Sequence, residues 1–295
     1  MEHTLFTGVS TALVTPFLNG AVNTPMLQQL LKYQMDNGIH SVVVCGTTGE
    51  AATLTEFEKL EIIQKSKEYV GNACQVIAGT GCNCTSKTIE RSIAAQEAGA
   101  DALLVVTPYY NKPTPDGLFA HYAAVAHSVS IPVIVYNVPS RTGTDIPVSV
   151  YKRLSIIPNI AGVKEASTDI SKIIKIKVAC PDTFCIWSGN DDLATPAICL
   201  GAKGVISVAS NVVPFEVHDM ATAALSGNYS KASILQRKLQ PLIEQLFSQT
   251  NPIPVKEAMR AIGYDCGCCR LPLTKSTPEH AEAIQNCLEV LKSTW

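Results

Sequence analysis

The chain has 295 residues, of which 46% are hydrophobic and 16% charged, and its formal net charge is −2. This composition provides a large apolar core and excludes a disordered chain. The sequence contains no basic stripe, which argues against a nucleic-acid partner, and no apolar run long enough to cross a bilayer. The length fits one large α/β barrel or two ordinary domains.

Short apolar runs alternate with amphipathic segments along the chain. Helical patterns lie between the runs, and Thr55-Glu56-Phe57-Glu58 forms a capping box at the start of one of them. After the eighth run the strand signals stop and four further helices are predicted. The predicted strands are residues 9–14, 41–44, 75–78, 102–106, 133–136, 160–164, 184–187 and 204–208, and the four helices are residues 213–225, 229–248, 254–262 and 278–291.

The repeated strand–helix order indicates parallel strands joined by right-handed crossovers. A doubly wound open sheet is the alternative. Eight strands, and the absence of a G-x-G-x-x-G turn after the first strand, favour an α/β fold of the (β/α)8 TIM barrel type. We predict a catalytic barrel over residues 1–225 and a C-terminal helical domain over residues 226–295.

The start of the chain, Met1-Glu2-His3-Thr4, has neither the basic nor the apolar region of a secretory signal. We therefore expect a cytoplasmic protein without a membrane partner. The eleven cysteines are expected to be reduced thiols in that compartment. The cluster Cys266-Gly267-Cys268-Cys269 lacks a second Cys or His pair at zinc-ligand spacing, which disfavours a metal site and leaves its role open.

Lys164 ends the apolar run Ile160-Ala161-Gly162-Val163-Lys164, at the carboxyl end of a predicted barrel strand, where such folds carry out chemistry. Burial removes water from an ammonium and favours the neutral amine, which can attack a carbonyl. Glu165 follows directly, but strand alternation turns its side chain to the opposite face. Taken alone, Lys164 is better explained as a strand-end lysine whose head reaches water. The surrounding motifs reverse this.

Several polar residues follow other predicted strands and should meet Lys164 at one mouth. The turn Gly46-Thr47-Thr48-Gly49-Glu50 suits a carboxylate or phosphate, although alone it is better explained as an ordinary glycine turn. Tyr110 and Tyr136 are phenols that can relay protons beside an amine nucleophile. Arg141 offers a guanidinium fork to a substrate carboxylate, and a surface ion pair would explain it equally well in isolation.

Taken together, these motifs resemble the dihydrodipicolinate synthase family of the N-acetylneuraminate lyase superfamily, from about Gly8 to the C-terminus. The resemblance implies a barrel with a C-terminal helical domain, assembled as a homotetramer. It implies that pyruvate condenses with aspartate 4-semialdehyde in lysine and diaminopimelate biosynthesis, without a cofactor or metal. The motifs are Gly46-Thr47-Thr48-Gly49-Glu50, Tyr109-Tyr110-Asn111-Lys112-Pro113-Thr114, Tyr136-Asn137-Val138-Pro139-Ser140-Arg141-Thr142-Gly143 and Gly162-Val163-Lys164-Glu165.

The resemblance also implies roles for individual residues. Lys164 would form a Schiff base with pyruvate, whose carboxylate Thr47 and Thr48 would hold. Thr48, Tyr136 and Tyr110 would form a proton relay, with Tyr110 supplied by a neighbouring subunit.

Three further positions complete the implied site. Arg141 would bind the carboxylate of aspartate semialdehyde, and Gly189 and Ile206 match positions that line the pyruvate pocket. One alternative is a pyruvate-dependent aldolase or lyase acting on a sugar acid, which would share Lys164 and Tyr136. Others are a non-catalytic barrel that binds a small anion, and a phosphate or flavin barrel.

Regulation can also be predicted from the resemblance. Some family members are inhibited by lysine in a cleft between subunits, where a carboxylate faces the bound ammonium. Here Lys59 and Lys87 occupy positions at which lysine-sensitive members carry a histidine and a glutamate, although Asn83 and Tyr109 remain and Glu56 could offer a replacement carboxylate. We expect the like charges to repel lysine.

Overall fold

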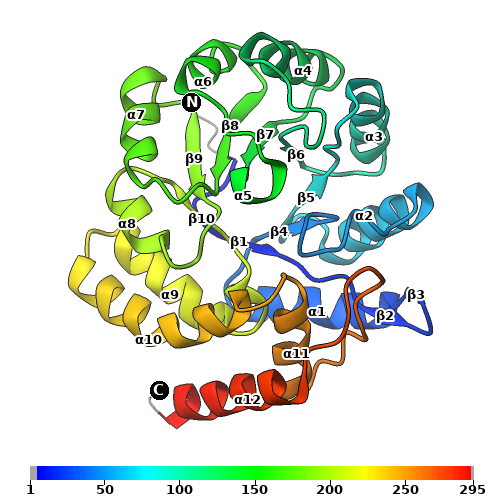
Figure 1. Cartoon of the computed structure of the whole chain (residues 1–295), viewed down its shortest axis with the longest axis vertical. Helices are drawn as coiled ribbons and strands as arrows, with labels where there is room; N and C mark the ends of the chain where they lie inside the picture. Colours follow the sequence, from blue (N-terminus) through cyan, green and yellow to red (C-terminus); the bar gives the residue numbers. More distant parts are fainter. Residues whose placement is uncertain (1–4, 294–295) are drawn as a thin grey trace.

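The computed structural model describes residues 5–293, so the segment Met1-Glu2-His3-Thr4, which carries the expectation about a secretory signal, lies outside the described residues. Within them, eight parallel strands close into a barrel in the order β1-β10-β9-β8-β7-β6-β5-β4 (Figure 1). The strands are β1 (Gly8–Ala12), β4 (Ser41–Val44), β5 (Gln75–Gly79), β6 (Ala102–Val106), β7 (Val133–Asn137), β8 (Ile160–Glu165), β9 (Cys185–Ser188) and β10 (Gly204–Ser207). The predicted fold class is confirmed, and every predicted strand is present.

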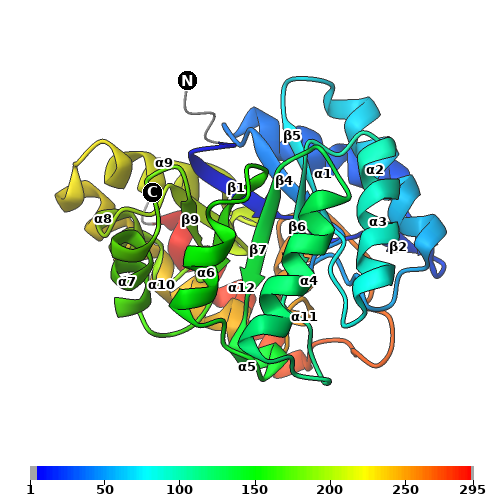
Figure 2. The same cartoon turned by 90° about the horizontal axis from the view of Figure 1, so that it is seen from above.

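Helices surround the strands in both views (Figures 1 and 2). Those of the barrel are α1 (Thr24–Asp36), α2 (Glu56–Val70), α3 (Thr85–Glu97), α4 (Pro115–His127), α5 (Pro139–Thr142), α6 (Val148–Leu154), α7 (Ser171–Ala179), α8 (Ala194–Cys199), the 3₁₀ helix η1 (Ala209–Asn211) and α9 (Pro214–Leu225). The C-terminal helices are α10 (Tyr229–Phe247), α11 (Ile253–Ala261) and α12 (Pro278–Ser293). The four helices predicted after the eighth strand are therefore present, and the division of the chain at residue 225 stays a prediction.

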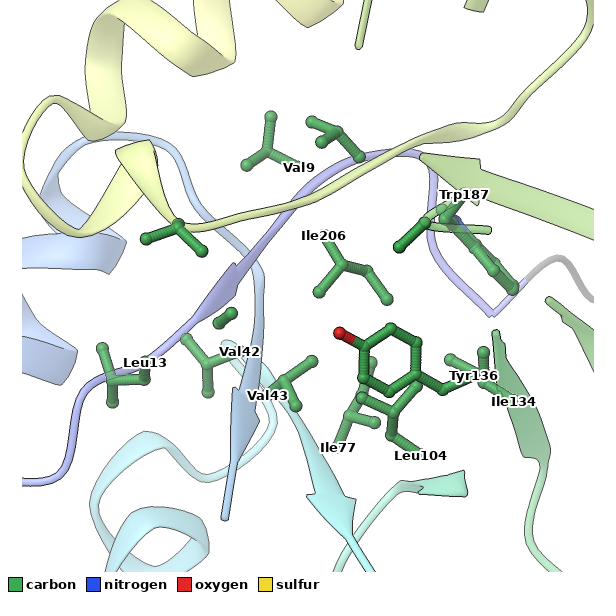
Figure 3. Packing of buried hydrophobic residues seen from close by; sticks show 14 of the residues in the cluster. Val9, Leu13, Val42, Val43, Ile77, Leu104, Ile134, Tyr136, Trp187 and Ile206 are labelled. Carbon is green, nitrogen blue, oxygen red and sulfur yellow. The ribbon is translucent and has the colours of Figure 1, made fainter. Parts of the chain in front are cut away.

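The interior of the barrel is filled by side chains. The strands β1, β4, β7, β9 and β10 are buried along their whole length. Apolar side chains such as Val43, Ile77 and Leu104 gather inside the barrel (Figure 3). The barrel is thus a packed core rather than a pore, and a binding site has to form at its mouth.

A small hairpin of β2 (Phe17–Leu18) and β3 (Ala21–Val22) was not predicted, because two-residue strands are too short to show an alternating pattern. Phe17 is buried, and its ring centroid lies 4.3 Å from Lys256 Nζ and 4.3 Å from Arg270 Cζ. These cation–π contacts connect the hairpin to the C-terminal part of the chain.

The structure also bears on membrane-spanning helices, metal ligands and the state of the cysteines. None of the helices in residues 5–293 is both long and apolar enough to span a membrane, and the same residues contain no group of three or more His, Cys, Asp or Glu side chains that could hold a metal ion. All eleven cysteines are free thiols. Burial raises the pKa of the Cys266 thiol to about 12, so it stays protonated at neutral pH.

The predicted capping box of α2 is present, and it has a second function. Thr55 Oγ1 accepts a hydrogen bond from Glu58 N, and the Glu58 carboxylate accepts one from Thr55 N. The same carboxylate pairs with the guanidinium of Arg270, whose Nη1 lies 2.9 Å from Oε2. The Arg270 hydrogen bonds lower the pKa of Glu58 to about 2. An ion pair thus joins α2 to the segment between α11 and α12.

We predict that Glu58→Gln lowers the free energy of unfolding by about 1–2 kcal/mol at pH 7, the usual scale for a hydrogen bond to a charged group. Since the pKa of Glu58 is depressed in the folded state, its contribution is complete above the ordinary carboxyl pKa and is lost as the pH falls towards 2. Urea unfolding at pH 7 and pH 3 measures this, with Glu68→Gln, at an exposed ion pair on the same helix, as the control. A difference from wild type that does not shrink at low pH would contradict the prediction.

Candidate active site

The register of two neighbouring strands brings Lys164 and Tyr136 together. In the pairing of β7 with β8, Tyr136 lies opposite Lys164. Residues opposite each other in parallel strands present their side chains on the same face. Lys164 Nζ accordingly lies 4.5 Å from the centroid of the Tyr136 ring, and both side chains are buried. The predicted nucleophile and the predicted proton donor therefore meet inside the mouth of the barrel.

Glu165 lies on the opposite face of β8, as predicted. Its carboxylate accepts hydrogen bonds from Asn137 Nδ2 at 2.8 Å, Tyr151 Oη at 3.0 Å and Ser167 N at 2.9 Å, and it lies 3.6 Å from Lys172 Nζ. Burial raises the pKa of Tyr151 well above its ordinary value, and the Glu165 charge adds to the effect. Glu165 is thus fully engaged in the layer between strands and helices and does not pair with Lys164.

A cavity of about 410 Å³ lies at the mouth above Lys164 and Tyr136. Residues of three predicted motifs, at the ends of β4, β7 and β8, line it, among them Thr47, Thr48 and Arg141. A second cavity of about 460 Å³ shares Thr47, Tyr136 and Arg141 with the first and extends to α2. Six predicted site residues thus line one space at the mouth of the barrel: Thr47, Thr48, Tyr136, Arg141, Lys164 and Gly189.

The turn after β4 presents the two threonine hydroxyls. Cys45 and Glu50 flank the turn with φ angles of 53° and 56°, in the left-handed region that non-glycine residues rarely adopt. Thr48 is buried, and its Oγ1 accepts a hydrogen bond from Asn251 Nδ2 at 2.9 Å. The turn therefore holds the Thr48 hydroxyl in place on a strained backbone. Backbone strain of this kind is common at functional sites.

Arg141 lies on the short helix α5, directly after β7. Its side chain reaches the cavity, and Nη2 donates to the main-chain oxygen of Asn251 at 3.2 Å. Arg141 is an exposed residue at the rim, whereas Lys164 is buried at the base. The guanidinium can therefore contact an anion near the entrance, while the amine lies deeper in the same cavity.

Of the two positions predicted to line the pyruvate pocket, Gly189 lines the cavity and Ile206 lies below it. Gly189 lines the cavity, and a Cβ atom there would lie 2.6 Å from the Cβ of Ala166, so the backbone can approach only as glycine. Ile206 is buried in β10 below the mouth, and the hydroxyl of Tyr136 points towards it (Figure 3). Ile206 lies beside Tyr136 and is not among the residues that line the cavity.

Tyr110 does not join the other predicted site residues within one chain. Its side chain is 91% exposed, and its φ angle of 73° places it in the left-handed region. A non-glycine residue held in this region stores backbone strain of roughly 1–3 kcal/mol, and such strain is often found at functional sites. An exposed side chain is compatible with the expectation that Tyr110 enters the site of a neighbouring subunit.

Two contributions to the site were missed by the sequence analysis. Gln249, Thr250 and Asn251 line the cavity from the connection between α10 and α11, a region with no periodic pattern that could reveal them, and Phe247 lines it from the last position of α10. Asp191 is buried two residues beyond Gly189, where its Oδ2 accepts hydrogen bonds from Val208 N and Ala209 N. Burial raises the pKa of Asp191, and hydrogen bonds from Ser207, Ala209 and Val208 counteract this.

The chain was compared with known proteins. A model described as the dihydrodipicolinate synthetase family matches residues 5–291. The chain therefore belongs to the dihydrodipicolinate synthetase family. It is 43% identical over 289 residues to 4-hydroxy-tetrahydrodipicolinate synthase of Acetivibrio thermocellus, covering 98% of each chain. It is 45% identical over 285 residues to that of Thermoanaerobacter sp., covering 96% of each.

Solved structures agree with these sequence relatives. The dihydrodipicolinate synthase of Aquifex aeolicus superimposes with a TM-score of 0.94 at 43% identity, with 98% of each chain covered. That of Thermotoga maritima gives a TM-score of 0.96 at 39% identity, with 98% of this chain and 99% of the other covered. The predicted family and the predicted activity, a lyase that synthesises 4-hydroxy-tetrahydrodipicolinate in lysine and diaminopimelate biosynthesis, are confirmed.

We predict that Tyr136→Phe and Thr48→Val each lower turnover by roughly 100-fold, the usual scale for the loss of a positioned acid–base group. Tyr136→Phe should fold with the thermal midpoint of the wild type, and Thr48→Val should fold with a lower midpoint, because it leaves Asn251 Nδ2 without its acceptor. Steady-state assays together with circular dichroism test this. Turnover within about threefold of wild type in both folded variants would rule out the relay.

Proposed function

We propose that Lys164 is the nucleophile of this synthesis and that the two substrates are pyruvate and aspartate 4-semialdehyde. The observation that carries the proposal is a buried primary amine beside a tyrosine ring, in a cavity that threonine hydroxyls and a guanidinium also line. An amine in such a site can form a Schiff base with a ketone. The names of the relatives support the same chemistry.

The proposed reaction begins when the neutral amine of Lys164 attacks the ketone carbon of pyruvate. The carbinolamine loses water and becomes an iminium, which accepts the electron pair left when a methyl proton departs. The resulting enamine carbon attacks the aldehyde of the second substrate, and the new alkoxide takes up a proton. The amine of that substrate then attacks the iminium carbon, displaces Lys164 and closes the ring. Each step uses groups of the chain and the substrates, so the proposal requires no metal or cofactor.

The other site residues have separate proposed roles. Thr47 and Thr48 hold the pyruvate carboxylate, and Thr48, Tyr136 and Tyr110 relay the protons that the carbinolamine and enamine steps need. Arg141 binds the carboxylate of aspartate semialdehyde. The exposed position of Arg141 at the rim, above the buried amine, supports the order in which the two substrates fill the cavity.

We also propose that the enzyme is a cytoplasmic homotetramer, built as a dimer of dimers, in which Tyr110 enters the site of a neighbouring subunit. The 91% exposure of Tyr110 supports an exchange between subunits. One solved relative, 39% identical, is described as the first monomeric dihydrodipicolinate synthase variant, which implies that multimers are usual among such enzymes. Sedimentation at assay concentration would test the assembly, and a fully active monomer would contradict it.

The decisive test of the nucleophile is covalent trapping. Borohydride added with saturating pyruvate should reduce the Schiff base, and mass spectrometry should find the adduct on the peptide that contains Lys164. Lys164→Ala should fold and remain unlabelled, and Lys164→Arg should fare no better, because a guanidinium stays protonated. An adduct on another residue, or none with the wild-type chain, would refute the proposal.

The role of Arg141 predicts an effect on one substrate only. Arg141→Ala should lower kcat/KM for aspartate semialdehyde by about 10–100-fold, since a hydrogen bond to a charged group is lost. Labelling of Lys164 by pyruvate should continue at the wild-type rate. An equal loss for both substrates would indicate a structural role. A preference for sugar-type aldehydes over aspartate semialdehyde in the wild type would favour the sugar-acid lyase.

We further propose that lysine does not inhibit this chain. Glu56, the carboxylate that could receive a bound ammonium, already accepts hydrogen bonds from Lys59 at 3.0 Å and from Arg91 at 2.6 Å. These two cations lower the pKa of Glu56 against the opposing effect of burial. An initial-rate titration should show full activity in millimolar lysine. Half-inhibition below about 1 mM, a binding free energy near −4 kcal/mol, would contradict this proposal.

A further inference from the structure

Asn251 is a residue of the C-terminal region that lies inside the catalytic mouth. It belongs to the connection between α10 and α11 and is 6% exposed. It lines the same cavity as Lys164, and also the adjoining cavity that reaches α2. A polar side chain buried at this point is held there by specific partners.

Two hydrogen bonds connect Asn251 to both halves of the site. Its Nδ2 donates to Thr48 Oγ1 at 2.9 Å, and its main-chain oxygen accepts from Arg141 Nη2 at 3.2 Å. Thr48 belongs to the turn after β4, and Arg141 follows β7. One residue from outside the barrel therefore contacts the hydroxyl of the proposed relay and the guanidinium proposed for the second substrate.

The polarity of the bond to Thr48 has a chemical consequence. A hydroxyl has one proton to donate and two lone pairs that accept. Because Asn251 donates to a lone pair, Thr48 cannot use its own proton on Asn251. That proton stays available for a group in the cavity, such as the oxygen of Tyr136 or of a substrate.

We propose that Asn251 is a positioning residue of the proton relay, which directs the Thr48 proton into the cavity while its main chain holds Arg141. The proposal rests on the proposed function, since it gives Thr48 a role in proton transfer. The Oδ1 atom of Asn251 is buried without a protein hydrogen-bond partner. Among the described residues, the side-chain amide of Asn251 is therefore held by its bond to Thr48 Oγ1.

The test is a set of variants that separate hydrogen-bond polarity from folding. Asn251→Asp replaces the donor by a carboxylate that can only accept, so the Thr48 proton should turn towards it. We expect kcat to fall by about 10–100-fold, the scale of one positioned proton-transfer group. The KM for pyruvate and the borohydride labelling of Lys164 should stay near wild type. Asn251→Ala, which leaves the Thr48 proton free, should lose less than Asn251→Asp.

A double-mutant cycle with Thr48→Val distinguishes positioning from a general structural effect. If Asn251 acts through the Thr48 hydroxyl, Asn251→Asp should change kcat by less than about threefold in the Thr48→Val background. The matched control is Asn159→Asp, which removes an amide donor to Ala126 O and Val129 O at the start of β8, away from the mouth. That control should keep the wild-type kcat at temperatures where it is folded.

Failure of the proposed function and failure of the positioning role of Asn251 give different results. If the wild-type chain is not labelled by pyruvate, the proposed function fails and the cycle is not needed. If it is labelled, a kcat above half the wild-type value in folded Asn251→Asp, or additive losses in the cycle, overturns the positioning role. Should Asn251→Asp fail to fold, the same cycle with Asn251→Ala decides the question.

Discussion

The site depends on the register between β7 and β8. That register sets Tyr136 opposite Lys164 on the inner face, and it sets Asn137 opposite Glu165 on the outer face. A shift by one residue would exchange the two faces, because side chains alternate along a strand. The amine would then lie among the helices and the carboxylate would lie in the barrel. The closed barrel makes this register rigid, since each strand is held by neighbours on both sides.

The C-terminal region is part of the site as well as a covering layer. Asn251 holds Thr48 and Arg141 directly. One turn of helix beyond it, Lys256 forms a buried ion pair with Glu50, at 2.5 Å, at the end of the threonine turn. A buried ion pair that lost one partner would leave an uncompensated charge, so this contact strongly constrains where the turn can lie. The region after the barrel thus holds the threonine turn through a hydrogen bond and an ion pair.

The sequence predicted most of this architecture for identifiable reasons. The strands are continuous apolar runs because both faces are buried, and Lys164 and Tyr136 stand out as polar residues at the ends of such runs. Asn251 could not be found in this way, because it lies between two helices and its partners are more than 100 residues away. The hairpin at Phe17 escaped notice because its strands have two residues each. Within residues 5–293, Tyr110 is 91% exposed and does not line the cavity above Lys164, so pattern and fold place only its backbone.

The most direct test of the account is the exchange of pyruvate methyl protons in D₂O without the second substrate, followed by proton NMR. If the buried amine forms an iminium that loses a methyl proton, the wild-type chain will replace those protons by deuterium. Tyr136→Phe will do so much more slowly while still being trapped by borohydride, and Lys164→Ala will not exchange them at all. Exchange by Lys164→Ala at the wild-type rate would contradict the central claim that this amine, held beside Tyr136, is where the chemistry begins.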